Sequence, residues 1–142
     1  MTLDAKSIHA SCVAWRDRAV LIVGASGKGK SSLALQLMAL GCALVADDKV
    51  MLREQGGKLM ASPPDTLAGM IEARGIGILQ ADFRAAAEIV FVVDLDMPPA
   101  KRFPEPQTRR FQNLDFPVVS GGDGSHFPAA VLQLLKGGWA RV

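Results

Sequence analysis

Four residues near the start of the chain have the types and the spacing of a phosphate-binding loop. Gly24 is followed by Gly29, Lys30 and Ser31, so the segment fits the pattern G-x-x-x-x-G-K-[ST]. Glycines let the backbone curl until its N–H groups converge on phosphate oxygens, and a helix that begins near the lysine adds the positive end of its dipole. In such loops the lysine reaches the β- and γ-phosphates, and the serine hydroxyl binds Mg²⁺. The pattern therefore predicts that the chain binds ATP or GTP with magnesium.

The predicted nucleotide-binding set extends over the whole loop and one residue beyond the motif. Its members are Gly24, Ala25, Ser26, Gly27, Lys28, Gly29, Lys30, Ser31 and Ser32. Lys28 is an additional cation inside the loop, and its side chain either contacts phosphate or is solvated.

A phosphoryl-transfer enzyme also needs a carboxylate near its metal, and often one near the nucleophile. Asp47 and Asp48 follow the short apolar segment 42–46, and Asp94 ends the apolar run 89–93. Ligands of open α/β sheets lie at the carboxyl ends of strands, a rule that both candidates satisfy. The pattern alone leaves the choice between them open.

Short strands, hairpins and helices must position these residues. A helical stripe of leucines follows the glycine loop, a Gly56–Gly57 turn joins two strands, and the Pro63–Pro64 pair favours the start of a helix that reaches about Glu72. The expected strands are 11–15, 19–23, 42–46, 50–53, 58–61 and 89–94, and the expected helices are 32–40, 63–72 and 128–136. The fold class is α/β: a mixed sheet around the phosphate-binding loop, with flanking helices and β-hairpins, in a single domain over 1–142.

Composition narrows the range of partners. A net charge of +2 gives no reason to expect a nucleic-acid partner. Cys12 and Cys42 fit neither a metal pattern nor a redox motif, which favours buried thiols in a reducing compartment. The first residues lack the basic and apolar regions of a signal peptide, and no apolar run approaches the roughly 18 residues of a membrane span. We expect a cytoplasmic protein with no membrane partner.

Four sequence blocks, in this order, resemble a known enzyme family. They are Ser7–Ser11 (SIHAS), the loop Gly24–Ser31, Leu44–Asp48 (LVADD) and Ile71–Leu79 (IEARGIGIL). Together they are similar to the HPr kinase/phosphorylase family of bacterial P-loop enzymes, which act on a seryl side chain of the phosphocarrier HPr. The resemblance covers nearly the whole chain and corresponds to the family's C-terminal catalytic domain, without the usual N-terminal domain.

The resemblance implies roles for individual residues. Asp48 resembles the catalytic acid/base, with Asp47 supporting it, and Lys30 resembles the catalytic lysine of the loop. Ser31 and Glu72 are implied as the magnesium ligands. Three further catalytic-site residues are implied by position: His9, Arg74 and, in the proline-rich segment 97–107, Arg102.

The function implied by the resemblance is an ATP- and Mg²⁺-dependent serine kinase acting on an HPr-like phosphocarrier. Family analogy also implies a homo-oligomer, a hexamer of catalytic domains. Family members carry a basic loop near the C-terminus that is associated with dephosphorylation, but segment 117–124 contains no Lys or Arg, so we expect the kinase direction. Two alternatives stay open: a small-molecule kinase of the ordinary P-loop type, and a nucleotide-binding regulatory module without catalysis.

Overall fold

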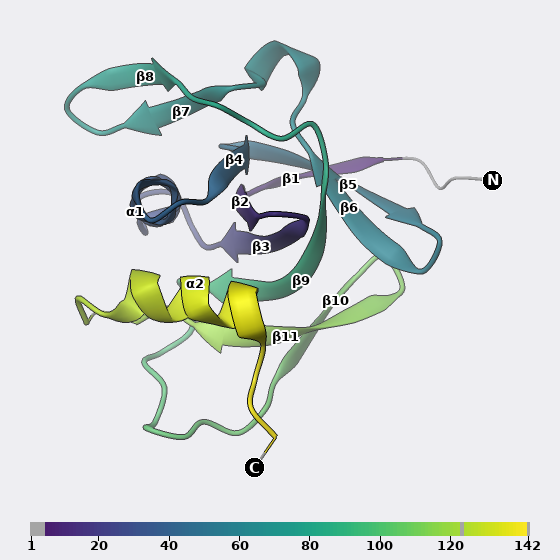
Figure 1. The fold of residues 1–142 in the computed structure, drawn as a ribbon, viewed down its shortest axis with the longest axis vertical. Coiled ribbons are helices and arrows are strands. Elements are labelled where there is room, and N and C mark those ends of the chain that lie inside the picture. The colour runs from purple at the N-terminus through teal and green to yellow at the C-terminus, as the bar shows by residue number, and fades with distance from the viewer. Residues whose placement is uncertain (1–4, 123, 142) are drawn as a thin grey trace.

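A curled mixed sheet forms the body of the protein, and both helices pack on one of its faces (Figure 1). The structure is a computed structural model that describes residues 5–122 and 124–141. The sheet runs in the order β1-β5-β6-β9-β3-β2-β4, with β11 beside β9 and β10 beside β11, while β7 and β8 form a separate hairpin. The strands are β1 (Lys6–His9), β2 (Ser11–Trp15), β3 (Arg18–Val23), β4 (Ala43–Ala46), β5 (Lys49–Gln55), β6 (Lys58–Ser62), β7 (Met70–Ala73), β8 (Gly77–Gln80), β9 (Ala87–Asp94), β10 (Thr108–Phe111) and β11 (Leu114–Ser120).

The strands β3, β4, β9 and β11 point the same way. β9 is parallel to both β3 and β11, and β2 is antiparallel to both β3 and β4, so β4 has the direction of β3. Their carboxyl ends therefore share one edge of the sheet. The glycine-rich loop 24–29 follows β3 at this edge, Asp47 follows β4, and Asp94 ends β9. The edge is where ligands of open α/β sheets bind.

Alternating side chains along the central strands supply the two cores. On β3, Leu21 and Val23 belong to the core that the curled sheet encloses, whereas Val20 and Ile22 face the helices. A period of two is the consequence of strand geometry, because successive side chains point to opposite faces. Burial on both faces explains why β3 and β9 are nearly continuous apolar runs.

The helices α1 (Lys30–Ala39) and α2 (Phe127–Gly137) both contribute to the second core. α1 begins directly after Gly29, which has φ +98° and so adopts the left-handed region that favours glycine. α2 carries a proline in its first turn, where the missing N–H costs nothing. Among the described residues, no helix is long and apolar enough to span a membrane.

Most expected elements are confirmed, and one is wrong. The hairpin before the glycine loop, the helix after it, the strand before Asp47, the 50–61 hairpin and the C-terminal helix are present with small shifts of their ends. The predicted helix from the Pro63–Pro64 pair to about Glu72 is wrong. The chain forms only a short 3-10 turn, Asp65–Leu67, and then β7. Gly69 has φ +73°, which ends the turn, and β7 buries Ile71 and Ala73 on one side.

Candidate functional site

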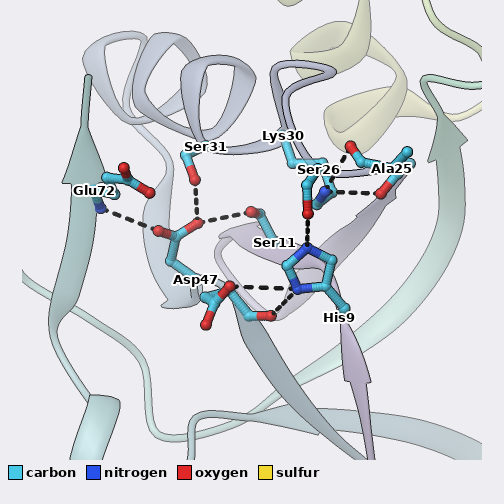
Figure 2. Close-up of polar contacts among 10 residues, drawn as sticks. His9, Ser11, Ala25, Ser26, Lys30, Ser31, Asp47 and Glu72 are labelled. Atoms are coloured by element: carbon cyan, nitrogen blue, oxygen red, sulfur yellow. Dashed lines mark hydrogen bonds and ion pairs between the residues drawn. The ribbon is translucent and has the colours of Figure 1, made fainter. Parts of the chain in front are cut away.

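The glycine-rich loop encloses the side chain of Lys30. This lysine is only 7% exposed, and its Nζ donates hydrogen bonds to the carbonyl oxygens of Gly24 (2.7 Å) and Ala25 (3.1 Å) (Figure 2). Gly27 and Gly29 have positive φ angles of 84° and 98°. Because a side chain at either position would be strained, glycine is required for the loop to curl around the ammonium group.

The amino end of α1 points into this loop. The described part of the chain supplies no side-chain cap for the helix, and its first turn contains no acidic residue. The first N–H groups of an α-helix have no partner within the helix. The loop therefore presents backbone donors, a helix dipole and one ammonium group in the same place, which is the chemistry of an anion site.

Asp47 is the centre of the polar contacts in Figure 2. Its Oδ1 accepts hydrogen bonds from the hydroxyls of Ser11 and Ser31, both at 2.7 Å, and its Oδ2 accepts one from the backbone N–H of Glu72 at 3.0 Å. The side chain is 5% exposed. Within the described residues it forms no ion pair, so its negative charge is stabilised by neutral donors alone.

Asp48 points the other way. It has φ +68°, a conformation that aspartate tolerates better than most residues, and the N–H of Lys49 donates across it to the carbonyl of Asp47 (2.7 Å). This tight turn buries Asp47 and leaves the Asp48 carboxylate 70% exposed. The two adjacent acids therefore have different environments and can have different roles.

His9 joins Asp48 to the glycine-rich loop. Its Nδ1 lies 3.0 Å from the Asp48 carbonyl oxygen and 3.3 Å from the Asp48 carboxylate. Because a carbonyl oxygen can only accept, Nδ1 carries the proton and the ring is oriented by this bond. Nε2 lies 3.4 Å from the hydroxyl of Ser26. The imidazole thus bridges the exposed acid and the loop (Figure 2).

A second buried carboxylate lies on the other side of β3. Asp94 is 4% exposed and is paired with the guanidinium group of Arg109 from β10. Its Oδ1 also accepts the backbone N–H of Asp96 (2.8 Å), and the Asp96 carboxylate accepts the N–H of Ala25 (2.9 Å). Asp94 therefore belongs to a structural network that ends at the first turn of the glycine-rich loop.

The remaining predicted residues lie farther from this cluster. The side chain of Glu72 is exposed on β7 and, in Figure 2, points to the side of Asp47 on which Ser31 lies. Arg74 is exposed in the turn between β7 and β8. Arg102 is exposed and stacks on Phe103, with its guanidinium carbon 5.2 Å from the ring centre. No hydrogen bond or ion pair within the described residues joins either arginine to the other candidates. Lys28 and Ser32 are exposed around the loop.

Three contributors were not identified from the sequence. Ser11 binds Asp47, Asp96 binds the loop at Ala25, and Arg109 neutralises Asp94. Ser11 lies in a sequence block that resembles the family, so its position was a usable signal. Asp96 and Arg109 carry no pattern of their own, because their contacts depend on how β9 and β10 are placed in space.

The donor set around Asp47 suits a hard cation better than a soft one. Hydroxyl and carboxylate oxygens, from Ser31, Asp47 and Glu72, are the ligands that Mg²⁺ prefers. Within residues 5–122 and 124–141 no three His, Cys, Asp or Glu side chains form a metal-binding cluster, so a cation here would also need ligand oxygens from a substrate. Burial raises the pKa of both cysteine thiols, that of Cys42 to about 11, which makes them poor metal ligands.

The chain is similar in sequence to known proteins over more than half of its length. Residues 2–98 match a family model described as the HPr Serine kinase C-terminal domain. The HPr kinase/phosphorylase of Brevibacillus brevis is 34% identical over 114 residues, covering 71% of this chain and 37% of that protein. That of Clostridium tetani is 52% identical over 60 residues, covering 42% and 20%. The chain thus spans between about a fifth and two fifths of the length of these two relatives.

A solved structure gives the same result for the fold. The Hpr(Ser) kinase/phosphatase from Coxiella burnetii superposes with a TM-score of 0.80 at 25% identity, covering 92% of this chain and 88% of the solved chain. A curled mixed sheet with few helices is therefore shared with that enzyme.

Proposed function

Because this chain belongs to the HPr serine kinase C-terminal domain family, we propose that it transfers the γ-phosphoryl group of ATP to a seryl hydroxyl of an HPr-like phosphocarrier protein. The observation that carries the proposal is the convergence of Lys30, Ser31, Asp47, Asp48 and His9 around one loop. They come from the first turn of α1, from β1 and from the two residues that follow β4.

The glycine-rich loop would hold the phosphates as a P-loop. Its backbone curls around the Lys30 ammonium group, and the uncapped amino end of α1 adds unpaired N–H donors. Both features fit an anion with several oxygens. When nucleotide is present, Lys30 would turn from the carbonyl groups of Gly24 and Ala25 to the β- and γ-phosphates.

Ser31 and Asp47 would hold magnesium, with Glu72 beside them. The Ser31 hydroxyl and the Asp47 carboxylate already lie in contact at 2.7 Å, and within the described residues Asp47 has no ion-pair partner that would compete with a cation. Bound Mg²⁺ would neutralise charge on the phosphate oxygens. Ser11 and the Glu72 backbone hold the carboxylate in one orientation, which limits the reorganisation that binding requires.

Asp48 would act as the general base. It is exposed, so a seryl hydroxyl of a partner protein can reach it, and His9 fixes its orientation. The seryl oxygen forms a bond to the γ-phosphorus, the bond to the β–γ bridging oxygen breaks, and the hydroxyl proton moves to the Asp48 carboxylate. ADP leaves with the bonding electron pair. The remaining contribution is positioning and electrostatic stabilisation.

The test is a phosphotransfer assay with the HPr-like carrier of the same cell. The purified chain is mixed with Mg²⁺, γ-labelled ATP and the carrier, and acid-stable label on the carrier is followed over time. We expect label on serine with the native chain and a loss of at least about 100-fold with Asp48→Asn, because a general base contributes about 10²–10⁴-fold. Asp82→Asn, another exposed acid, is the matched control and should not change the rate.

Other outcomes distinguish the alternatives. Bound ATP with no label on the carrier would exclude this acceptor and favour a small-molecule acceptor if label appears on a metabolite. Nucleotide binding without turnover on any acceptor would favour a non-catalytic regulatory module. Near-normal turnover of Asp48→Asn would show that the base is assigned to the wrong residue.

A further inference from the structure

A cavity lies beside the glycine-rich loop rather than around Asp47. It has a volume of about 1060 Å³ and is enclosed by the segment 97–107, β11 and α2. Figure 1 shows this segment looping out next to β11 and α2, at the edge where the parallel strands end. The function proposed above leaves this space unassigned.

The cavity and the glycine-rich loop share a wall. Leu95 packs between Gly24 and Gly121, since a Cβ added to either glycine would lie 3.1 Å or 2.7 Å from Leu95 side-chain atoms. Met97 and Gly121 line the cavity, and between Leu95 and Met97 the Asp96 carboxylate holds the Ala25 N–H. A ligand whose phosphates occupy the loop therefore has the cavity as its immediate neighbour.

The strand order indicates in which direction a nucleoside would extend from phosphates bound in the glycine-rich loop. On one side of β3, the ends of β2 and β4 carry the Ser11–Asp47–Ser31 cluster, which is polar and closely hydrogen-bonded. On the other side, the ends of β9 and β11 lead into the cavity. A nucleoside attached to phosphates in the loop would therefore extend toward β11.

The lining has the chemistry of a nucleoside site. Its walls are mostly apolar and include Pro98, Pro104, Val118, Phe127 and Trp139, flat or rigid surfaces on which a planar base can pack. Lys101, Glu105 and Gln107 supply a few polar groups for ribose hydroxyls and base edges. Small-molecule sites typically combine about 300–1,000 Å³ of mainly apolar space with a few polar groups, so this cavity is large enough for a base and a sugar.

We propose that this cavity binds the nucleoside part of ATP, with the base packed among the side chains of segment 97–107, β11 and α2. The inference rests on the proposed function, because it needs the triphosphate in the glycine-rich loop. The inference names the residues that would recognise the nucleoside. It assigns segment 97–107 to nucleotide selection instead of phosphoryl transfer.

Two adjacent alanines of α2 allow a matched test. Ala130 lines the cavity, whereas Ala129 is also exposed on the same helix but is not among the lining residues. Affinities for Mg²⁺–ATP and for Mg²⁺–tripolyphosphate are measured by calorimetry with Ala130→Trp and Ala129→Trp. We expect the native chain to bind ATP at least ten-fold more tightly than tripolyphosphate. Ala130→Trp should remove that difference while leaving the tripolyphosphate affinity unchanged, and Ala129→Trp should change neither.

Tryptophan fluorescence provides a second measurement, which does not need a substitution that fills the cavity. Trp139 lines the cavity, and Trp15 is the other tryptophan of the chain. ATP should change the tryptophan emission, tripolyphosphate should not, and Trp139→Phe should abolish the change. Equal affinities for ATP and tripolyphosphate, or an Ala130→Trp chain that binds ATP normally, would overturn the nucleoside site while the phosphate loop stands. If neither compound binds, the phosphate loop itself fails, and the nucleoside site fails with it.

Discussion

Asp47 and Asp94 are two buried carboxylates at the same edge of the sheet, and the difference between them lies in their partners. They are 5% and 4% exposed, and they follow or end parallel strands on opposite sides of β3. Asp94 is paired with Arg109, so its charge is neutralised within the protein. Among residues 5–122 and 124–141, Asp47 receives only hydroxyl and amide donors. Under the proposed function, the neutral donors around Asp47 leave its carboxylate for a cation, whereas burial and strand position are the same for both acids and do not distinguish them.

The largest effect expected from this comparison is that of Asp47→Asn on magnesium-dependent binding. The amide cannot neutralise a cation, and its NH₂ group would face at least one of the donors that now bind the carboxylate. We expect the affinity for Mg²⁺–ATP to fall by about 100-fold, near the upper end of losses measured for groups that orient metal ligands. Calorimetry with and without Mg²⁺ measures this effect.

Asp94→Asn is the matched control for that prediction. It removes the same charge from an equally buried strand end, but the charge it removes is already paired with Arg109. The Mg²⁺-dependent part of the ATP affinity should stay within about three-fold of the native value, because no metal ligand is lost. Equal losses for the two variants would mean that the partner of the carboxylate does not distinguish their roles.

A smaller effect is expected from the two serines that bind Asp47. Ser31→Ala removes the hydroxyl nearest the glycine-rich loop and should weaken Mg²⁺–ATP binding by about ten-fold, the value of one lost hydrogen bond to a charged group. Ser11→Ala removes a hydroxyl on the far side, in β2. It should lower the free energy of unfolding by about 1 kcal/mol and weaken Mg²⁺–ATP binding less than Ser31→Ala does, because Ser11 orients Asp47 without being a proposed metal ligand itself. Similar effects of both variants on binding would contradict the assignment of Ser31.

The Asp94–Arg109 pair should contribute to the stability of the fold and not to Mg²⁺–ATP binding. Asp94→Asn is expected to lower the free energy of unfolding by about 1–2 kcal/mol, because Arg109 loses its charged partner while the Asp96 N–H keeps an acceptor. Urea denaturation measures this loss. In a double-mutant cycle with Arg109→Gln the losses should be non-additive, and simple additivity would argue against a stabilising pair.

Sequence patterns located the glycine-rich loop and the two adjacent acids, but they did not predict which acid is buried and which is exposed. The glycine-rich loop, the strand before it and the helix after it follow from local rules, and their elements are confirmed. Adjacency placed Asp47 and Asp48 at the same strand end. Only the turn at Asp48, with φ +68°, determines that one side chain is buried and the other exposed. That turn contacts β1, which lies far away in the sequence: His9 pairs with Lys49, and its ring hydrogen-bonds to the Asp48 carbonyl.

The wrong helix has a similar origin. The Pro63–Pro64 pair is a common start of a helix, and the following residues include good helix formers. β7 is only four residues long, so its alternation of buried and exposed side chains is too short to outweigh that signal. The hydrogen bond from the Glu72 backbone to Asp47 is a tertiary contact. The sequence of segment 63–72 by itself does not predict this hydrogen bond.

The smallest predicted effect concerns Cys42, which lies at the end of β4 opposite to Asp47. At this end burial disfavours the charged form of a thiol, whereas at the other end the carboxylate accepts three hydrogen bonds. Burial raises the pKa of the Cys42 thiol from about 9 to about 11, and the nearby Lys136 partly opposes this shift. Because the folded state has the higher pKa, the stabilisation is complete below pH 9 and is lost as the pH rises from 9 to 11.

Comparison with Cys42→Ala isolates this contribution from other groups that titrate in the same range. The free energy of unfolding of both chains is measured by urea denaturation between pH 8 and pH 11. The native chain should lose more stability than the variant above pH 9, so the difference between them should shift in favour of the variant. A difference that stays constant with pH would show that solvent reaches the thiol in the folded chain.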